Sequence, residues 1–276
     1  MKNLRGKIAA VTGAGSGIGR ATAIALASEG CDVAISDINK EGLEETESII
    51  EGKGVRVSTT ILDVSVKKDV HAWADKVIRE HGKVNIIVNN AGVGVGAIIE
   101  KMTYEDFEWL FNINFWGMVY GTKAFLPLLK EAGEGHVVNI SSVFGIIGVP
   151  TQAAYNCAKF GIRGFTEVLR QELDIDDCNV SATSIHPGGI KTNIARDSRF
   201  GDMGKISVDL NNVAQMFDKL AFTSSEKAAK CIVKGIKKNK RRVLIGPDAY
   251  MIDIMQRCLP TTYQKLITFG AKRFAK

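Results

Sequence analysis

The chain has 276 residues, 45% of them hydrophobic and 24% charged, and it contains no linker rich in proline or serine. A chain of this length and composition can bury a substantial core, which excludes a disordered protein and predicts a single compact unit. The formal net charge of +6 is concentrated in residues 226–276, which carry 13 Lys and Arg against 3 Asp and Glu.

Neither the cysteines nor the histidines show the spacing of a metal site. The five cysteines are an odd number without a Cys-x-x-Cys pair, and none of the four histidines has a partner at ligand spacing. We therefore expect no metal and no disulfide scaffold, but reduced thiols in the cytoplasm. A cytoplasmic location also fits a first apolar run that starts within a few residues of Met1, and no apolar run reaches membrane-spanning length.

In chain order, the first predicted elements are a strand over residues 6–11, a glycine-rich loop over 12–19 and a helix over 21–30. This layout brings backbone N–H groups and a helix N-terminus to a diphosphate, with glycines where a Cβ would block the approach. The alternative is an ordinary glycine turn. The strand and the helix on either side favour a dinucleotide site.

A second predicted strand, over residues 32–36, ends in Asp37. A carboxylate at this position suits the two free hydroxyls of an adenosine ribose and repels a 2′-phosphate. No Arg or Lys stands at Ser16 or Ile38, where a phosphate would need one. The sequence therefore favours NAD over NADP as the cofactor, and an ordinary surface aspartate is the alternative interpretation of Asp37.

Apolar strands continue to alternate with helical stretches along the chain. Seven strands are expected, near Lys7, Val33, Val55, Ile86, Val137, Val180 and Val243. Strands that alternate with helices form a parallel sheet covered on both faces. The sequence thus predicts an α/β protein of the Rossmann type, with a doubly wound seven-stranded parallel sheet in three α/β/α layers. The cofactor is expected at the carboxyl ends of the strands.

Tyr155 and Lys159 lie four residues apart in a predicted helix. On one helical face, a lysine ammonium beside a phenol favours the ionised phenol and lowers its pKa from about 10 toward the working pH. Such a tyrosine can exchange a proton with an alcohol or a ketone. The alternative is a chance pair of surface residues, because both residue types are common on helices.

The spacing of these motifs resembles the short-chain dehydrogenase/reductase family over about residues 4–246. The likeness includes the glycine loop, Asp63-Val64, Asn89-Asn90-Ala91-Gly92, the strand over 137–142 and Pro187-Gly188. The resemblance implies a catalytic set of Asn114, Ser142, Tyr155 and Lys159, in which the spacing to Tyr155 selects Ser142 over Ser141. The cofactor-binding residues that it implies are Gly13, Ser16, Gly17, Ile18, Gly19, Asp37, Asp63, Val64, Asn90, Ala91, Gly92, Tyr155, Lys159, Pro187, Gly188, Ile190 and Thr192.

The resemblance also implies a role for each catalytic residue. Ser142 is expected to hydrogen-bond the substrate oxygen, Tyr155 to act as acid or base on it, and Lys159 to lower the Tyr155 pKa and hold the nicotinamide ribose. Asn114 is expected to hold a water that connects Lys159 to solvent. Simpler interpretations stay open: Ser142 as a cap after a strand, Asn114 as a satisfied polar residue in a long helix, and Thr192 as a helix cap.

Residues 190–225 are too many for an ordinary connection, and the resemblance implies that they form a lid over the substrate. The segment is apolar, and the wall beside Tyr155 is expected to consist of Val93, Val143, Phe144, Ile146 and Val149. An apolar lid over an apolar wall favours a lipophilic secondary alcohol or ketone, such as a steroid, an aryl ketone or a medium-chain compound. The alternative is that the lid side chains face the core.

The sequence divides into a dinucleotide-binding and catalytic domain over residues 1–247 and a basic, amphipathic helical extension over 248–276. Apolar residues recur in the extension at helical spacing, interrupted at Pro260. We expect this apolar face to pack on the protein's own body or on another subunit. Contact with an anionic membrane surface is the less favoured alternative, and nucleic acid is not expected as a partner.

Predicted helices over residues 105–130 and 153–174 are expected to pair in a homodimer or homotetramer, with Gly117 and Gly121 allowing close approach. The same glycines suit packing on the protein's own sheet. The predicted activity is an NAD(H)-dependent interconversion of a secondary alcohol and a ketone. The alternatives are an NADPH-dependent ketone reductase and a dinucleotide-sensing or scaffold protein without catalysis, but a pure binder has no need of the Ser142, Tyr155 and Lys159 set.

Overall fold

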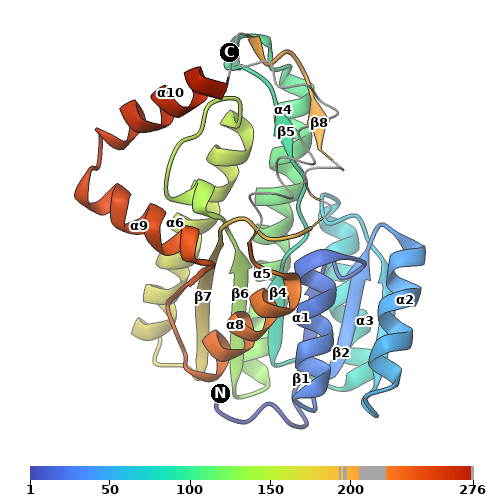
Figure 1. Cartoon of the computed structure of the whole chain (residues 1–276). Coiled ribbons are helices and arrows are strands. Elements are labelled where there is room, and N and C mark those ends of the chain that lie inside the picture. Colours follow the sequence, from blue (N-terminus) through green and yellow to red (C-terminus); the bar gives the residue numbers. More distant parts are fainter. Residues whose placement is uncertain (193, 195–197, 205–221, 275–276) are drawn as a thin grey trace.

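In the computed structural model, the seven predicted strands form one parallel sheet in the order β3-β2-β1-β4-β6-β7-β9 (Figure 1). Their bounds are β1 Ile8–Thr12, β2 Asp32–Asp37, β3 Val57–Ile61, β4 Ile86–Asn89, β6 Gly135–Ile140, β7 Val180–Pro187 and β9 Arg242–Ile245. The structure describes the chain except for residues 193, 195–197, 205–221 and 275–276. The doubly wound α/β fold predicted from the alternation of elements is confirmed.

The strands are apolar on both faces, as a parallel sheet between two helical layers requires. In β1, Ala9 and Val11 belong to one buried cluster, whereas Ile8 and Ala10 belong to the other. Val11 lies beside Val88 of the neighbouring strand β4. Side chains of one strand therefore contribute to two cores, one on each face of the sheet.

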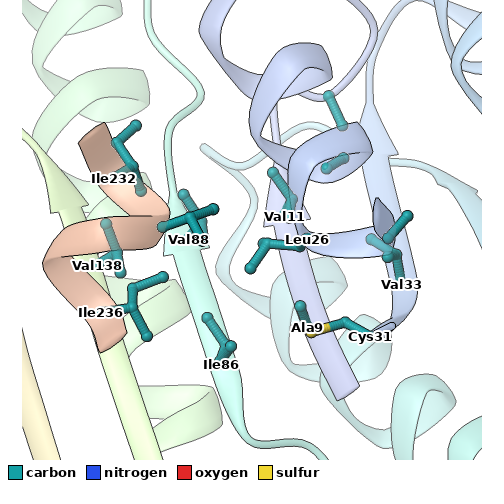
Figure 2. Packing of buried hydrophobic residues seen from close by; sticks show 14 of the residues in the cluster. Ala9, Val11, Leu26, Cys31, Val33, Ile86, Val88, Val138, Ile232 and Ile236 are labelled. Carbon is teal, nitrogen blue, oxygen red and sulfur yellow. The ribbon is translucent and has the colours of Figure 1, made fainter. Parts of the chain in front are cut away.

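Helices cover both faces of the sheet. One face carries α1 (Gly17–Ser28), α2 (Lys40–Glu51) and α8 (Ser225–Lys237), and the other carries α3 (Lys67–His81), α5 (Gly117–Glu131) and α6 (Ala153–Ile175). Figure 2 shows Ile232 and Ile236 of α8 beside Val88 and Val138 of the central strands. Complete burial of one such isoleucine contributes about 2 kcal/mol, so these contacts anchor α8 firmly to the sheet.

The strand order reverses between β1 and β4. The chain runs outward from β1 through β2 to β3 and then crosses to β4 on the other side of β1. In open α/β sheets, ligands bind at the carboxyl ends of the two strands that flank such a reversal. Here the loop after Thr12 of β1 meets the loop after Asn89 of β4, and this is where the candidate site lies.

The long helix predicted over residues 105–130 consists of three segments. These are α4 (Tyr104–Phe111), a π-helical turn (Asn112–Trp116) and α5. Single π-helical turns inside α-helices occur frequently at functional sites, because the wider turn displaces backbone and side chains from the regular positions. The turn contains Asn114, one of the four predicted catalytic residues.

Gly117 and Gly121 of α5 pack on the protein's own body. A Cβ on Gly117 would lie 2.8 Å from Val64 Cγ2, and one on Gly121 would lie 2.1 Å from Asn89 Oδ1. Neither position has room for a side chain. The structure therefore supports the packing interpretation of these two glycines and not the close approach of a second subunit.

A small second sheet was not predicted. It pairs β5 (Val95–Gly96) in parallel with β8 (Arg199–Phe200), which belongs to the predicted lid. The Arg199 guanidinium lies 3.0 Å from the Asp106 carboxylate and 3.6 Å from the centroid of the Trp109 ring. These contacts attach the described part of the lid to α4. Lid residues 205–221 lie outside the described residues.

The C-terminal extension forms α9 (Pro247–Cys258) and α10 (Tyr263–Phe274), with the break at the predicted Pro260. One face of the extension packs on the loop after β6: Tyr263 is buried against Ile146 and Ile147, and its hydroxyl accepts the Gly148 N–H at 3.1 Å. Of the helices in the described part of the chain, none has the length and apolar character needed to span a bilayer.

Candidate active site

The glycine-rich loop between β1 and α1 is packed too closely for side chains. A Cβ on Gly13 would lie 2.8 Å from Ala91 Cα, and one on Gly19 would lie 2.0 Å from the Gly13 carbonyl oxygen. Gly13 and Gly17 also have φ values of 63° and 54°, a region that other residues rarely adopt. The glycines therefore allow the loop to pack tightly at the carboxyl edge of the sheet, where a diphosphate-binding loop is expected.

The N-terminus of α1 carries no counter-charge of its own. Its N-cap residue Ser16 makes no side-chain capping bond, and its first turn contains no acidic residue. The first N–H groups and the positive end of the helix dipole are thus available to an anion. Ile18 packs its side chain on the core, and Thr192 lies against the loop, because a Cβ on Gly17 would be 3.2 Å from Thr192 Cγ2.

Asp37, at the end of β2, is fixed beside the same loop. Its Oδ2 accepts the Gly15 N–H at 2.9 Å, and its Oδ1 accepts the Asn39 N–H at 2.9 Å. Two backbone donors therefore orient the carboxylate at the end of the crevice where the adenosine ribose of a dinucleotide is expected.

Arg20 of α1 is a cation near this carboxylate that the sequence motifs do not single out. Its guanidinium donates to the carbonyl oxygens of Gly15 and Gly42, and it lies 2.7 Å from the Glu45 carboxylate. The position of Arg20 directly after Gly19, the last glycine of the loop, could have identified it in the sequence. Glu45 lies on α2, and only the folded chain reveals that it pairs with Arg20.

The loop after β4 is tied to the glycine loop by four hydrogen bonds. Asn90 Nδ2 donates to the carbonyl oxygens of Thr12 and Gly13 at 3.0 and 3.1 Å. Thr12 Oγ1 accepts the N–H groups of Asn90 and Ala91 at 3.0 and 3.1 Å. The structure thereby joins two predicted cofactor-binding segments into one wall of the crevice.

Asn114 is buried in the π-helical turn and fixes the next part of this wall. Its Oδ1 accepts the Val93 N–H at 2.8 Å, and its Nδ2 donates to the Val93 carbonyl at 2.9 Å. A Cβ on the neighbouring Gly92 would lie 3.2 Å from Asn114 Oδ1. The Asn114 amide is therefore satisfied by the backbone, as its simpler interpretation requires.

Asp63 and Val64 follow β3 and differ in exposure. The Asp63 carboxylate is exposed and accepts the N–H and the hydroxyl of Ser65 at 2.9 and 2.7 Å. Val64 is buried against Gly117. The pair thus places a fixed carboxylate at the surface and an apolar side chain beneath it.

Ser142, directly after β6, faces Tyr155 of α6. Ser142 Oγ accepts the Phe144 N–H at 3.1 Å as the cap of a 3-10 turn (Val143–Gly145), and it lies close enough to the Tyr155 side chain to favour the ionised phenol. The capping interpretation is therefore correct without excluding a catalytic one. The Phe144 ring stands at 88° to that of Tyr155 with centroids 6.0 Å apart. Ile146, predicted for the wall, is instead buried against Tyr263.

Lys159 lies one turn after Tyr155 and is 3% exposed. Its Nζ is 5.3 Å from the centroid of the Tyr155 ring and donates to the Ile140 carbonyl at 2.9 Å. Burial lowers the pKa of Lys159 to about 8. Burial also raises the pKa of Tyr155 to about 12, and the nearby Ser142 side chain opposes this rise only in part.

The predicted lowering of the Tyr155 pKa by Lys159 is therefore wrong for the protein chain alone. Removal of the phenol from water disfavours the phenolate, and this is the largest effect on the Tyr155 pKa. The ammonium is also directed at the Ile140 carbonyl and not at the phenol oxygen.

His186 of β7 is buried behind Ser142. Because the Ser142 carbonyl can only accept, Nδ1 of His186 carries a hydrogen and donates to it at 3.0 Å, and Nε2 accepts from the Ser184 hydroxyl at 2.9 Å. Burial lowers the pKa of His186 to about 4, against a smaller opposing effect of the bond to Ser142. A neutral imidazole thus holds the backbone of Ser142.

The segment after β7 is held by the C-terminal extension. Asp248 Oδ2 accepts the Gly189 N–H at 2.6 Å, and a Cβ on Gly188 would lie 2.0 Å from the same oxygen. Pro187 and Ile190 on either side are buried. The sequence places Asp248 in the extension. In the structure, its carboxylate binds the backbone of the segment that is predicted to contact the nicotinamide.

Within the described ranges, no three side chains of His, Cys, Asp or Glu come together as a metal site. All five cysteines are thiols outside any disulfide, and Cys157 is exposed on α6.

Known proteins are similar to this chain in sequence and in fold. The putative oxidoreductase SadH of Mycobacterium tuberculosis is 43% identical over 275 residues, which cover 99% of this chain and 98% of the relative. Estradiol 17-beta-dehydrogenase 11 of Macaca fascicularis is 38% identical over 197 residues, 71% of this chain and 66% of the relative.

A solved structure and a family model agree with these relatives. A short chain dehydrogenase/reductase from Burkholderia phymatum, in complex with NAD, matches with a TM-score of 0.85 and 27% identity over 93% of this chain and 95% of that one. The family model for short chain dehydrogenase matches residues 7–202. The chain is therefore an oxidoreductase that belongs to the short-chain dehydrogenase/reductase family.

Proposed function

We propose that this oxidoreductase interconverts a secondary alcohol and a ketone with NAD(H). The observation that carries the proposal is that Ser142 and the buried Lys159 both lie beside Tyr155. With a pKa of about 12, Tyr155 is a neutral phenol near pH 7 and can donate its proton to a ketone oxygen. Ser142 hydrogen-bonds the same oxygen as negative charge develops on it.

Alcohol oxidation follows the reverse path, in which Tyr155 takes the hydroxyl proton. Lys159, whose pKa is about 8, supplies positive charge that favours this transfer. A bound nicotinamide supplies or accepts the hydride, and its oxidised form adds a positive charge. We assign to Asn114 the fourth catalytic position, where it supports the loop through Val93. In this role it would hold a water between Lys159 and solvent.

Each part of a dinucleotide has a candidate segment in the structure. The glycine loop with the N-terminus of α1 suits the diphosphate, because Ser16 makes no capping bond and the first turn of the helix contains no acidic residue. Asp63 and Val64 suit the adenine end, and Pro187 to Thr192 suit the nicotinamide end. Asp37 supports NAD, because its carboxylate is fixed by Gly15 and Asn39 at the ribose position and would repel a 2′-phosphate.

Arg20 is the observation that favours the alternative of NADPH. Its guanidinium lies at the carbonyl of Gly15, the residue whose N–H binds Asp37. We favour NAD because Glu45, 2.7 Å from Arg20, already pairs with this cation. Rates with NADH and NADPH at equal concentration distinguish the two cofactors.

We propose a lipophilic substrate. The apolar Phe144 lies beside Tyr155, and Phe200 of the lid strand β8 pairs in the sheet with β5. The relative named estradiol 17-beta-dehydrogenase acts, by its name, on a lipophilic steroid alcohol. A carboxylate or sugar would need more polar anchors than these side chains offer.

A graded panel of secondary alcohols and ketones, followed by absorbance of the reduced cofactor, tests this function. We expect turnover that rises with apolar surface of the substrate and requires Tyr155. Turnover of polar substrates alone would contradict the lipophilic assignment. If the protein binds NADH but turns over no member of the panel, the dinucleotide-sensing alternative is favoured instead.

We also propose a homodimer or homotetramer, since members of this family commonly form oligomers. Phe160, Val168 and Ile175 of α6 are large apolar side chains exposed on one long helix. Paired α6 helices would remove them from water. The molar mass in solution tests this proposal, and a monomer at micromolar concentration would contradict it.

A further inference from the structure

The C-terminal extension has a second apolar face that the body does not cover. We call it the outer face; it consists of Tyr250, Met251 and Ile254 of α9 and Leu266 and Phe269 of α10, each more than half exposed. In α9 these positions follow helical spacing and alternate with Ile252 and Met255, which pack on the body. Each helix therefore buries one apolar stripe and exposes another.

Such a double stripe differs from the ordinary surface of a globular protein. Single exposed apolar side chains are common, but five large ones on two consecutive short helices indicate an interaction site. Figure 1 shows α9 and α10 together at one side of the molecule, beyond the loop that they cover. The residues of the outer face therefore belong to two consecutive helices on one side of the molecule.

Positive charge accompanies the outer face. Lys265 directly precedes Leu266, Lys272 lies one turn after Phe269, and both cations are exposed. Arg257, one turn after Ile254, is also exposed but shares the Asp253 carboxylate. The extension contains two acidic residues, Asp248 and Asp253, and both carboxylates already have partners. Asp248 binds the Gly189 N–H, and Asp253 pairs with Arg242 at 2.5 Å and with Arg257 at 3.0 Å.

Apolar side chains flanked by exposed cations fit an anionic bilayer, where the apolar groups enter the headgroup boundary and the cations meet lipid phosphates. A second copy of this chain fits less well. A two-fold axis through the outer face would place Lys265 and Lys272 of both copies against each other, and this repulsion opposes the contact.

We propose that the outer face docks the protein on the surface of an anionic lipid bilayer. The orientation follows from the fold. The extension begins directly after β9, at the carboxyl edge of the sheet, and Tyr263 packs on the loop that follows Ser142. A docked molecule thus holds this edge of the sheet, and the crevice with it, near the lipid.

Co-sedimentation of the full-length protein with vesicles tests the proposal. One set of vesicles contains phosphatidylcholine with about one third phosphatidylglycerol, and the other contains phosphatidylcholine alone. We expect the parent protein to bind the anionic vesicles and not the neutral ones. The double variant Lys265→Gln/Lys272→Gln should bind about 25-fold more weakly at low ionic strength, since each cation near an anionic surface contributes about fivefold.

Removal of the apolar contacts provides the second arm. Ile254→Glu/Phe269→Glu should bind more than about tenfold more weakly, because two large side chains no longer enter the lipid. Matched controls are Ile49→Glu on α2 and Lys67→Gln/Lys68→Gln on α3, which change exposed residues of the same types elsewhere. Both controls should bind like the parent protein, and NADH binding should show that every variant is folded.

Three results would overturn the proposal. The first is parental vesicle binding by Ile254→Glu/Phe269→Glu, and the second is equal binding of the parent protein to neutral and anionic vesicles. The third is a lower molar mass in solution for Ile254→Glu/Phe269→Glu than for the parent protein, which would show that a second copy covers the outer face.

Discussion

His186 links the position of Ser142 to the stability of the fold in mild acid. The imidazole is buried, and its two nitrogens are occupied by the Ser142 carbonyl and the Ser184 hydroxyl. Protonation would place a second N–H and a positive charge at a position without solvent. We therefore expect the folded state to resist protonation of His186 and to lose stability as the pH falls.

The sign and size follow from the pKa. The folded-state pKa of His186 is about 4, below the ordinary value near 6.5, so the unfolded chain binds the proton first as the pH falls. The stability from neutral His186 is complete above about pH 6.5 and is lost as the pH falls toward 4. The whole effect is about 3 kcal/mol, of which about 1.3 kcal/mol is lost between pH 7.5 and 5.5.

Urea unfolding at pH 7.5 and 5.5 measures this loss in the parent protein and in His186→Asn. Asparagine can still donate to the Ser142 carbonyl but does not titrate. The variant should lose about 1.3 kcal/mol less than the parent between the two pH values. The exposed His71→Asn is the control and should behave like the parent. Identical pH dependence of His186→Asn and the parent protein would refute the reasoning.

Three further outcomes are expected. Asp37→Ala should lower the ratio of kcat/KM with NAD to kcat/KM with NADP by at least about tenfold, because a charge that repels the 2′-phosphate is lost. An unchanged ratio would contradict the cofactor argument. Tyr263→Phe should lower the free energy of unfolding by about 1 kcal/mol through loss of the bond to Gly148, and no change in urea denaturation would count against that contact. The kcat/KM for ketone reduction should fall as the pH rises through about 8, where Lys159 loses its proton, whereas a profile that stays flat well above this pH would disagree.

The fold could be predicted because its signals are local. Each strand is a short apolar run, and the glycines of residues 12–19 predict the turn between β1 and α1. The small sheet of β5 and β8 could not be predicted in this way, because each strand has two residues and the partners are about one hundred positions apart. The π-helical turn at Asn114 depends on its contact with Val93, which no local pattern reveals.

The candidate site shows the same division between local and distant contacts. The spacing of Ser142, Tyr155 and Lys159 was visible in the sequence, and the structure brings these residues together. The pKa of Tyr155 in the protein chain alone was predicted in the wrong direction, since burial is a property of the folded chain. Asp248 reaches Gly189 across 59 positions, so its contribution to the crevice also depends on the tertiary fold.

Tyr155→Phe tests the central claim most directly. The variant keeps the ring and removes only the hydroxyl that lies beside Ser142. With the best ketone of the panel, we predict that the rate of NADH oxidation falls by at least about a thousandfold while NADH binding, followed by fluorescence, is unchanged. Ketone reduction by Tyr155→Phe at the parental rate would contradict the account.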